Sequence, residues 1–162
     1  MLNPEIKIKD KSFRVIYIRF KGEYVEFRKE SRKMFNELFA FTKKNDLIIE
    51  GETKVLTIYH DNPYITDGKN LRTSVAMTIS AGAKITEEGR ICEMAFSGKY
   101  AILSFELKLN EYEDAWKYAY NEWLPTHKAV KPRDDFPFEL YVTEPPRNFK
   151  QRSFTDIYIP IE

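Results

Sequence analysis

Hydrophobic and polar side chains alternate along the start of the chain. Residues 5–9 and 12–20 place apolar side chains at nearly every second position, as strands with one buried face do. Asp10 and Lys11 interrupt this alternation. We therefore predict two paired strands joined by a tight turn at these two residues.

The period of the pattern changes after Gly22. Apolar side chains then recur at steps of three and four, as an amphipathic helix requires. This stripe consists of Tyr24, Phe27, Ser31, Met34, Leu38 and Phe41. Two further strands are predicted beyond the helix, at residues 54–59 and 72–79, with turn-forming residues between them.

The second half of the chain repeats this order. Strands are predicted at residues 91–96, 100–108, 137–142 and 154–159. The first two are expected to turn at Ser97 and Gly98. Asn110 is a suitable N-cap for a helix, and Glu113 three residues later completes a capping box. Pro125 is expected to stop this helix.

The two halves also align with each other. Residues 59–79 match residues 141–161 without a gap, at an offset of 141 − 59 = 82. Residues 11–24 resemble residues 98–112 with one inserted residue. The identical pairs in the ungapped block are Tyr59 and Tyr141, Pro63 and Pro145, Thr73 and Thr155, and Ile79 and Ile161. We infer an internal duplication.

This duplication predicts the domain organisation. The repeats span residues 1–80 and 90–162, and residues 81–89 link them. Each repeat is too small to bury much apolar surface alone. We therefore predict one α+β domain over residues 1–162. It has duplicated strand-strand-helix-strand-strand modules about a pseudo-twofold axis, antiparallel sheets and a central groove.

Composition narrows the classes of partner. The chain has 162 residues, 43% of them hydrophobic, and a formal charge of +1, so we expect no direct binding to nucleic acid. No apolar run approaches the roughly 20 residues that cross a bilayer, and we expect no membrane association. The single Cys92 fits a reducing compartment. We predict a cytoplasmic protein.

Several catalytic and cofactor motifs are missing from the sequence. It contains no Gly-x-Ser-x-Gly elbow, zinc-ligand spacing, Walker lysine loop or Gly-x-Gly-x-x-Gly turn. We therefore expect no metal and no cofactor. His60, at the end of a predicted strand, is expected to be a turn or surface histidine. Carboxylates and aromatic side chains remain as candidate functional groups.

Glu139 is the carboxylate of most interest. Strand alternation places it on one face with Pro137 and Tyr141. It lies either on a solvated outer face or in a partly desolvated site that calls for a cation or a proton, and the residues alone favour neither. The offset of 82 sets Thr57 opposite Glu139. One repeat would thus present a charge where the other presents a hydroxyl.

Aromatic side chains make up 15% of the chain and supply further candidates. Each alone is more typical of core packing than of ligand contact. Together with one carboxylate, such rings would form a box that accepts a cation. The candidate ligand-binding set is Glu139, Tyr141, Tyr59, Thr57, Tyr17, Trp116 and Tyr120.

Four stretches in fixed order carry a family resemblance. They are residues 58–72 (IYHDNPYITDGKNLR), 96–103 (FSGKYAIL), 137–142 (PFELYV) and 156–161 (DIYIPI). The ordered set resembles the GyrI-like small-molecule-binding family, which includes DNA gyrase inhibitory proteins and the effector-binding domains of certain AraC- and MerR-type regulators. The resemblance covers essentially the whole chain.

The resemblance implies both a fold and a site. The family fold is a pair of strand-helix-strand-strand modules, and its groove often holds a glutamate that meets cationic, lipophilic ligands. PFELYV places Glu139 at that position. Ser74 stands where many relatives carry an aspartate, which leaves the ligand class open. Without a helix-turn-helix motif, the chain resembles the stand-alone members.

Two classes of function follow. The favoured one is a protein that binds lipophilic or cationic compounds, with a toxin-protective role or a modulating action on DNA gyrase. The alternative is a hydrolase of electrophilic small molecules, because some relatives resemble such enzymes. Glu139 would then act as general base, and Tyr141 or Tyr59 would donate the proton. We expect binding rather than catalysis because no second catalytic group can be assigned from the sequence.

Overall fold

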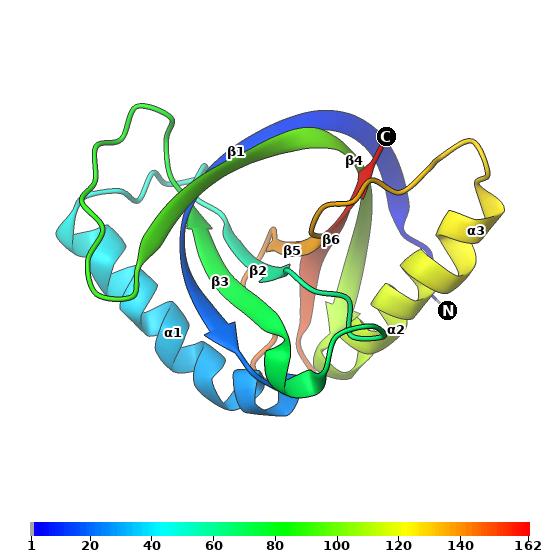
Figure 1. The fold of residues 1–162 in the computed structure, drawn as a ribbon, viewed down its shortest axis with the longest axis horizontal. Coiled ribbons are helices and arrows are strands. Elements are labelled where there is room, and N and C mark those ends of the chain that lie inside the picture. The colour runs from blue at the N-terminus through cyan, green and yellow to red at the C-terminus, as the bar shows by residue number, and fades with distance from the viewer. Residues whose placement is uncertain (1) are drawn as a thin grey trace. The chain divides into compact units, whose positions relative to one another are not determined.

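The computed structural model of the protein describes residues 2–162, which form two compact units (Figure 1). Unit 1 contains residues 2–11 and Gly98–Glu162, and unit 2 contains Ser12–Ser97. In each unit, antiparallel strands carry a helix on one face. No helix in residues 2–162 has both the length and the apolar character that crossing a bilayer requires.

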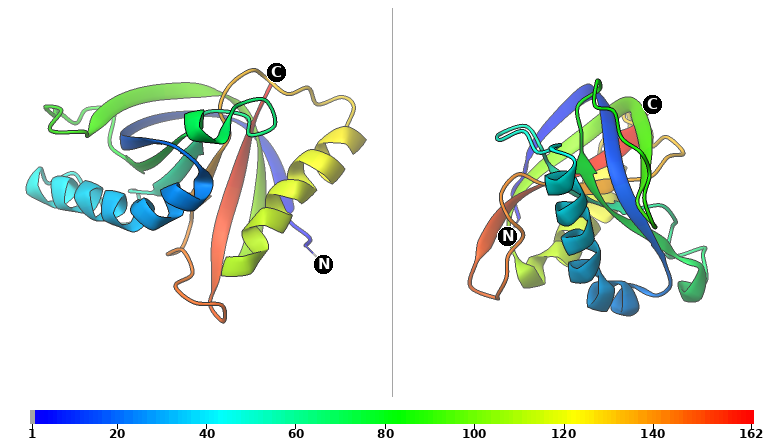
Figure 2. Two further views of the ribbon diagram at one scale, coloured as in Figure 1. Left: turned by 60° about the horizontal axis from the view of Figure 1, so that its bottom comes forward. Right: turned by 90° about the vertical axis from the view of Figure 1, so that its left-hand side faces the viewer.

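Unit 2 is built from three antiparallel strands and one helix. Strand β3 (Arg72–Thr78) lies between β1 (Glu5–Lys21) and β2 (Val55–Tyr59). Helix α1 (Tyr24–Lys44) covers one face of these strands (Figure 2). The predicted stripe of α1 is confirmed, because its buried apolar residues pack with those of β1 and β3. This core includes Phe27, Met34, Leu38, Phe41, Ile16, Ile18, Val75 and Met77.

Unit 1 has the same arrangement. Strand β6 (Arg152–Ile161) lies between β4 (Cys92–Lys108) and β5 (Phe138–Tyr141). The helical segment on one face consists of a 3₁₀ turn (Leu109–Glu111), α2 (Tyr112–Lys117), a π-helical turn (Tyr118–Trp123) and α3 (Leu124–Thr126). Its core includes Ala115, Ala119 and Trp123 from the helical segment, with Leu103, Phe105, Ile157 and Ile159 from the strands.

The strand registers of the two units correspond. In unit 2, Leu56 lies opposite Ala76 on the neighbouring strand. In unit 1, Phe138 lies opposite Tyr158, and 56 + 82 = 138 while 76 + 82 = 158. The register is therefore the one that the aligned repeats require. The α+β class with antiparallel strands is confirmed, whereas the duplication, the repeat boundaries, the pseudo-twofold axis and the central groove stay predictions.

Two predicted turns are wrong. Residues 5–21 form the single strand β1, and β4 likewise continues through Ser97 and Gly98. A two-residue hairpin needs positive φ at its central residues, and Asp10 and Lys11 do not have it. Gly98 does, at φ +149°, but there it lets the guanidinium of Arg133 approach the strand backbone closely. Each half therefore runs strand-helix-strand-strand.

The predicted start of the second helix is also wrong. The α2 helix begins at Tyr112, after the 3₁₀ turn, and the Glu111 carboxylate accepts a hydrogen bond of 2.8 Å from the Lys108 backbone N–H. Asn110 is therefore not the cap. The helical segment ends at Thr126, one residue beyond Pro125, so the predicted end is correct to within one residue.

Candidate functional site

Glu139 lies under the helical segment of unit 1. It pairs across the strands with Ile157, a core residue beneath that segment, so both side chains share the helix-covered face. The side chain is buried, with only 4% of its surface exposed. Trp116 Nε1–H donates a hydrogen bond of 2.6 Å to Oε1, and Tyr141 O–H donates one of 2.7 Å to Oε2. The solvated outer face considered above is therefore not where this carboxylate lies.

Local geometry explains why these donors reach Glu139. Tyr141 follows two residues later on β5, so its side chain points to the same face of the strand. Trp116 comes from α2 above that face. Tyr120, one helical turn further along the chain, stacks on Trp116 with ring centroids 6.1 Å apart and planes 12° from parallel. Burial raises the pKa of the Tyr120 hydroxyl, so this ring stays neutral.

A pair of hydroxyl groups lies beside the Glu139 carboxylate. Tyr112, the first residue of α2, and Thr155 of β6 bring their hydroxyl oxygens within 2.7 Å of each other. Burial raises the pKa of Tyr112 to about 12; the bond with Thr155 lowers it, and the charge of Glu139 raises it. Tyr112 is therefore close enough to Glu139 for the charge of the carboxylate to affect the pKa of its hydroxyl. The sequence prediction missed both Tyr112 and Thr155 as site residues, although the duplication marked Thr155 as the counterpart of Thr73.

The arrangement in unit 1 places a buried carboxylate beside aromatic side chains. A buried carboxylate accepts hydrogen bonds from the Trp116 indole and the Tyr141 hydroxyl, and the ring of Tyr120 stacks on Trp116. Aromatic faces attract cations, and the attraction is stronger where water is excluded. Within residues 2–162 no three histidine, cysteine or acidic side chains gather as metal ligands would. The candidate functional group is therefore the Glu139 carboxylate, with aromatic side chains next to it.

The structure places the other three candidate residues in unit 2. Thr57 and Tyr59 of β2 lie on the face that α1 covers, since Thr57 is opposite the core residue Val75. Thr57 is buried, and Tyr59 meets the ring of Tyr24 edge-on at 5.8 Å. Tyr17 lies on the opposite face from these two, because its neighbours Ile16 and Ile18 point to α1. The Arg19 guanidinium lies 5.6 Å from the Tyr17 ring centroid.

His60, which we expected to be a turn or surface histidine, follows β2 and is only partly exposed. Its Nε2 lies 2.7 Å from the Ser74 hydroxyl, and Ser74 is fully buried. Desolvation lowers the pKa of His60 to about 4, and the charges of Arg19 and Arg72 act in the same direction. The imidazole is therefore neutral near pH 7, and the pair is a partly buried hydrogen-bonded contact.

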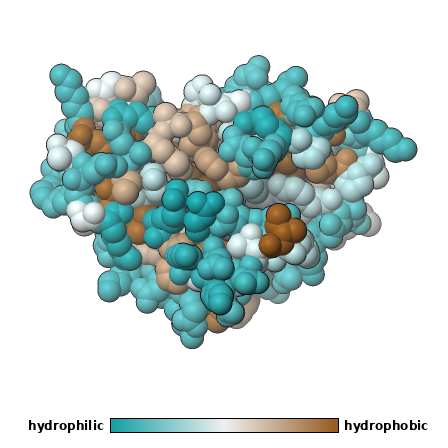
Figure 3. Space-filling view, in the orientation of Figure 1, coloured by the Kyte–Doolittle hydropathy of each residue, from teal (hydrophilic) through white to brown (hydrophobic). Residues whose placement is uncertain are grey.

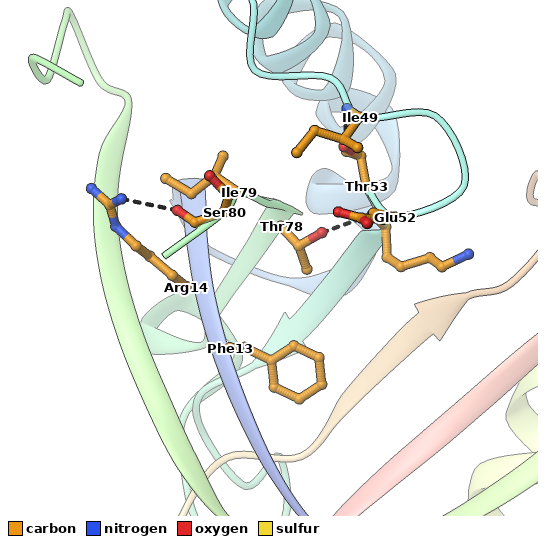
Figure 4. Close-up of a pocket in the computed structure, with 9 residues that line it drawn as sticks. Phe13, Arg14, Ile49, Glu52, Thr53, Thr78, Ile79 and Ser80 are labelled. Atoms are coloured by element: carbon orange, nitrogen blue, oxygen red, sulfur yellow. Dashed lines mark hydrogen bonds between the residues drawn. The ribbon is translucent and has the colours of Figure 1, made fainter. Parts of the chain in front are cut away.

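One surface pocket lies away from the predicted site residues. A pocket of about 230 Å³ in unit 2 is lined by residues of β1, β3 and the loop after α1 (Figure 4). Arg14 there donates to the Ser80 carbonyl at 3.1 Å and pairs with Glu93. The Thr78 hydroxyl accepts from the Lys54 N–H at 2.8 Å. Arg14 and Thr78 in this pocket thus bond to other parts of the protein, and we do not assign a ligand to the pocket.

Comparison with solved structures supports the fold. The C-terminal domain of EcmrR matches 98% of the chain and 98% of its own length, with a TM-score of 0.74 and 17% identity. In the EcmrR–DNA complex, the chain spans 57% of the whole EcmrR chain. SAV2435 bound to tetraphenylphosphonium matches 98% of the chain and 94% of its own length, with a TM-score of 0.59 and 13% identity.

A further neighbour is a hydrolase from Listeria innocua, which matches 98% of the chain and 93% of its own length, with a TM-score of 0.62 and 8% identity. A search among curated proteins found no match. The family model for the GyrI-like small molecule binding domain, by contrast, matches residues 3–162. On this match over almost its whole length, the chain belongs to the GyrI-like small-molecule-binding family.

Proposed function

We propose that this protein binds a lipophilic organic cation at Glu139. The observation that carries the proposal is a carboxylate with 4% exposure that accepts hydrogen bonds from the aromatic side chains of Trp116 and Tyr141. Burying a negative charge is unfavourable, and a cation offsets this more fully than neutral hydrogen bonds do. SAV2435, which shares the fold, was solved with tetraphenylphosphonium bound.

The rings around Glu139 favour a cation with an apolar body. Each cation–π contact contributes roughly 0.5–2 kcal/mol, the larger values applying where water is absent. A small, strongly hydrated ion would lose its water shell without burying apolar surface in return. An aromatic phosphonium or a hydrophobic amine gains both the charge contact and the ring contacts. We therefore propose hydrophobic cations as the ligand class.

Access to the carboxylate involves Trp116. Because Glu139 is almost completely buried, a bound cation must take a place that a protein side chain now fills. The indole N–H of Trp116 donates a hydrogen bond to Oε1 of Glu139. The indole ring lies between Glu139 and the partly exposed Tyr120. We propose that the indole moves aside when the ligand enters, so that the ligand replaces a neutral donor by a positive charge.

The cellular role belongs to the same proposal. A cytoplasmic protein with such a site would sequester lipophilic cationic compounds and so protect the cell against toxins. A modulating action on DNA gyrase is the alternative role. A supercoiling assay with purified gyrase separates the two: protection alone predicts no change in supercoiling at micromolar protein, and inhibition there would favour the gyrase role.

A hydrolase is the second candidate, favoured by the contact between Tyr141 and Glu139. In this version Glu139 takes a proton from water, the resulting hydroxide attacks the electrophilic carbon, and Tyr141 gives its proton to the leaving atom. The 2.7 Å bond between the two groups then allows the proton on Glu139 to return to Tyr141. Water is added and both residues are regenerated. A fold neighbour described as a hydrolase is consistent with this version.

Glu139→Gln tests the binding proposal. The amide keeps the size of the side chain but removes its charge, so affinity for tetraphenylphosphonium should fall by about tenfold or more, the equivalent of about 1.4 kcal/mol. Neutral triphenylphosphine oxide serves as the matched ligand and should lose little. Calorimetric titration measures both. Equal losses for the two ligands would rule out recognition by charge. Repeated turnover of electrophilic compounds, followed by mass spectrometry, would instead support the hydrolase.

A further inference from the structure

Unit 2 contains a ring of aromatic side chains around one threonine. Thr73 of β3 lies between Phe20 of β1 and Tyr59 of β2, directly across the strands from both. The first turn of α1 adds Tyr24 and Phe27 from above. Tyr24 meets Tyr59 at 5.8 Å and Phe27 meets Phe20 at 6.0 Å between ring centroids. We call these five residues the Thr73 cluster.

The hydroxyl of Thr73 is buried without a partner. The residue has 0% exposure, and its Oγ1 makes no hydrogen bond to any atom of residues 2–162. A buried hydroxyl that lacks a partner destabilises the folded state, so native proteins nearly always satisfy such groups. An unsatisfied hydroxyl at the centre of four rings therefore calls for an explanation beyond packing.

The equivalent position in unit 1 shows what is missing. The offset of 82 relates Thr73 to Thr155, and the Thr155 hydroxyl lies 2.7 Å from the hydroxyl of Tyr112. The same offset relates Tyr59 to Tyr141. Unit 2 thus keeps a tyrosine and a threonine at these positions, but Tyr24 at the start of α1 packs against Tyr59 and leaves the threonine unsatisfied.

The charges around the cluster differ from those in unit 1. Thr57 occupies the position of Glu139, so no carboxylate lies on this face of β2. The charge of Asp61 contributes to raising the pKa of Tyr24. The Asp61 carboxylate accepts two hydrogen bonds from the Arg72 guanidinium, of 2.8 and 2.9 Å. Neither β2 nor Asp61 therefore offers this face a carboxylate like that of Glu139. The cluster offers apolar rings and one hydroxyl, which suits a neutral aromatic ligand with a single polar atom.

We propose that unit 2 holds a second ligand site at the Thr73 cluster, which takes a small neutral phenol. The aromatic ring of the ligand packs among Phe20, Phe27, Tyr24 and Tyr59, and its hydroxyl bonds to Thr73 Oγ1. The ligand enters past the first turn of α1, where the N-cap residue Glu23 makes no side-chain hydrogen bond to hold the helix end.

This site is independent of the cation site proposed at Glu139. The two use different strands, different helices and opposite ligand chemistry. Each can therefore fail while the other stands, and the same set of variants separates them.

Titration with 4-fluorophenol, followed by ¹⁹F NMR of the ligand, tests the proposal on the full chain. Thr73→Val keeps the shape of the side chain and removes the hydroxyl, so the affinity should fall by about tenfold, as expected for one lost hydrogen bond. Thr155→Val is the matched control in unit 1 and should bind 4-fluorophenol like the wild type. Glu139→Gln should also leave this affinity unchanged, and Thr73→Val should leave tetraphenylphosphonium binding unchanged.

Thermal unfolding without ligand gives a second measurement. Thr73→Val removes an unsatisfied hydroxyl and should keep or raise the melting temperature. Thr155→Val breaks a hydrogen bond and should lower it. The proposal is overturned if millimolar 4-fluorophenol does not bind, if Thr73→Val binds it as the wild type does, or if Glu139→Gln abolishes the binding. A loss of stability in Thr73→Val equal to that in Thr155→Val would also overturn it, because the hydroxyl would then have a partner.

Discussion

Replacing Trp116 by Phe separates two effects of the indole beside Glu139. The change removes the Nε1–H donor that lies 2.6 Å from the carboxylate, while an aromatic ring remains on α2 next to Tyr120. The folded protein loses a hydrogen bond to a charged acceptor. An incoming cation, in contrast, no longer competes with the indole for the same oxygen. We therefore predict a less stable protein that binds the cation more tightly.

The structure sets the size of both effects. A hydrogen bond to a charged group contributes about 1.5–3 kcal/mol to stability. For a chain of this length, each kcal/mol shifts Tm by about 2–4 °C, so Trp116→Phe should melt about 3–12 °C lower. The same interaction limits the gain in affinity. If the ligand no longer has to break it, tetraphenylphosphonium should bind up to about ten- to a hundredfold more tightly.

Thermal unfolding and calorimetric titration with tetraphenylphosphonium measure the two effects. Trp123→Phe is the control, because Trp123 is buried at 4% exposure and stacks on His127 at 4.8 Å, seven residues beyond Trp116. This control should melt at a lower temperature but bind the cation normally. Weaker cation binding by Trp116→Phe, together with normal binding by Trp123→Phe, would show that the indole does not compete with the cation. The indole would then be a wall of the site and not a competitor for the carboxylate.

Two further predictions concern stability. Gly98→Ala should destabilise the fold by about 1–3 kcal/mol in urea unfolding, because an added Cβ would collide with Arg133 and the φ of +149° disfavours any other residue; Gly82→Ala, with open space around it, should be nearly neutral. The pKa of His60 is about 4 when folded and about 6.5 when unfolded, so the unfolded chain binds more protons between these values. Stability should therefore fall as the pH drops from 6.5 to 4, and His60→Asn should lose most of this dependence; an unchanged slope would mean that another group causes it.

Periodicity predicted the elements that carry the site. The helical stripe through Met34 and Leu38 is confirmed, as are the strands at residues 54–59, 72–79, 137–142 and 154–159 to within three residues at each end. The two false turns show the limit of this reasoning. A break in alternation signals a turn only if the backbone adopts a turn conformation, and Asp10 stays extended. Gly98 has the conformational freedom of a turn but uses it to accommodate Arg133.

The candidate site was predictable in part. Tyr141 lies beside Glu139 because residues two apart on a strand share a face, and Trp116 and Tyr120 stack because they are one helical turn apart. Whether Glu139 faced water or the interior depended on which side of the strands the helix covers, which periodicity does not specify. The pairing of Tyr112 with Thr155 joins residues 43 positions apart and required the folded structure.

The face of the molecule shown in Figure 3 is largely hydrophilic, with hydrophobic residues scattered among polar ones. Isolated exposed hydrophobic side chains are normal on soluble domains. The proposed binding function therefore depends on buried groups, above all on the environment of Glu139.

Binding of the cation at Glu139 can be seen in a crystal structure of the protein with tetraphenylphosphonium. The account predicts that the phosphorus lies within about 6 Å of the Glu139 carboxylate, the range over which opposite charges interact strongly in proteins. It also predicts that the Trp116 Nε1–H no longer bonds to Oε1. A cation found elsewhere, with the 2.6 Å bond between Trp116 and Glu139 still in place, would contradict the account.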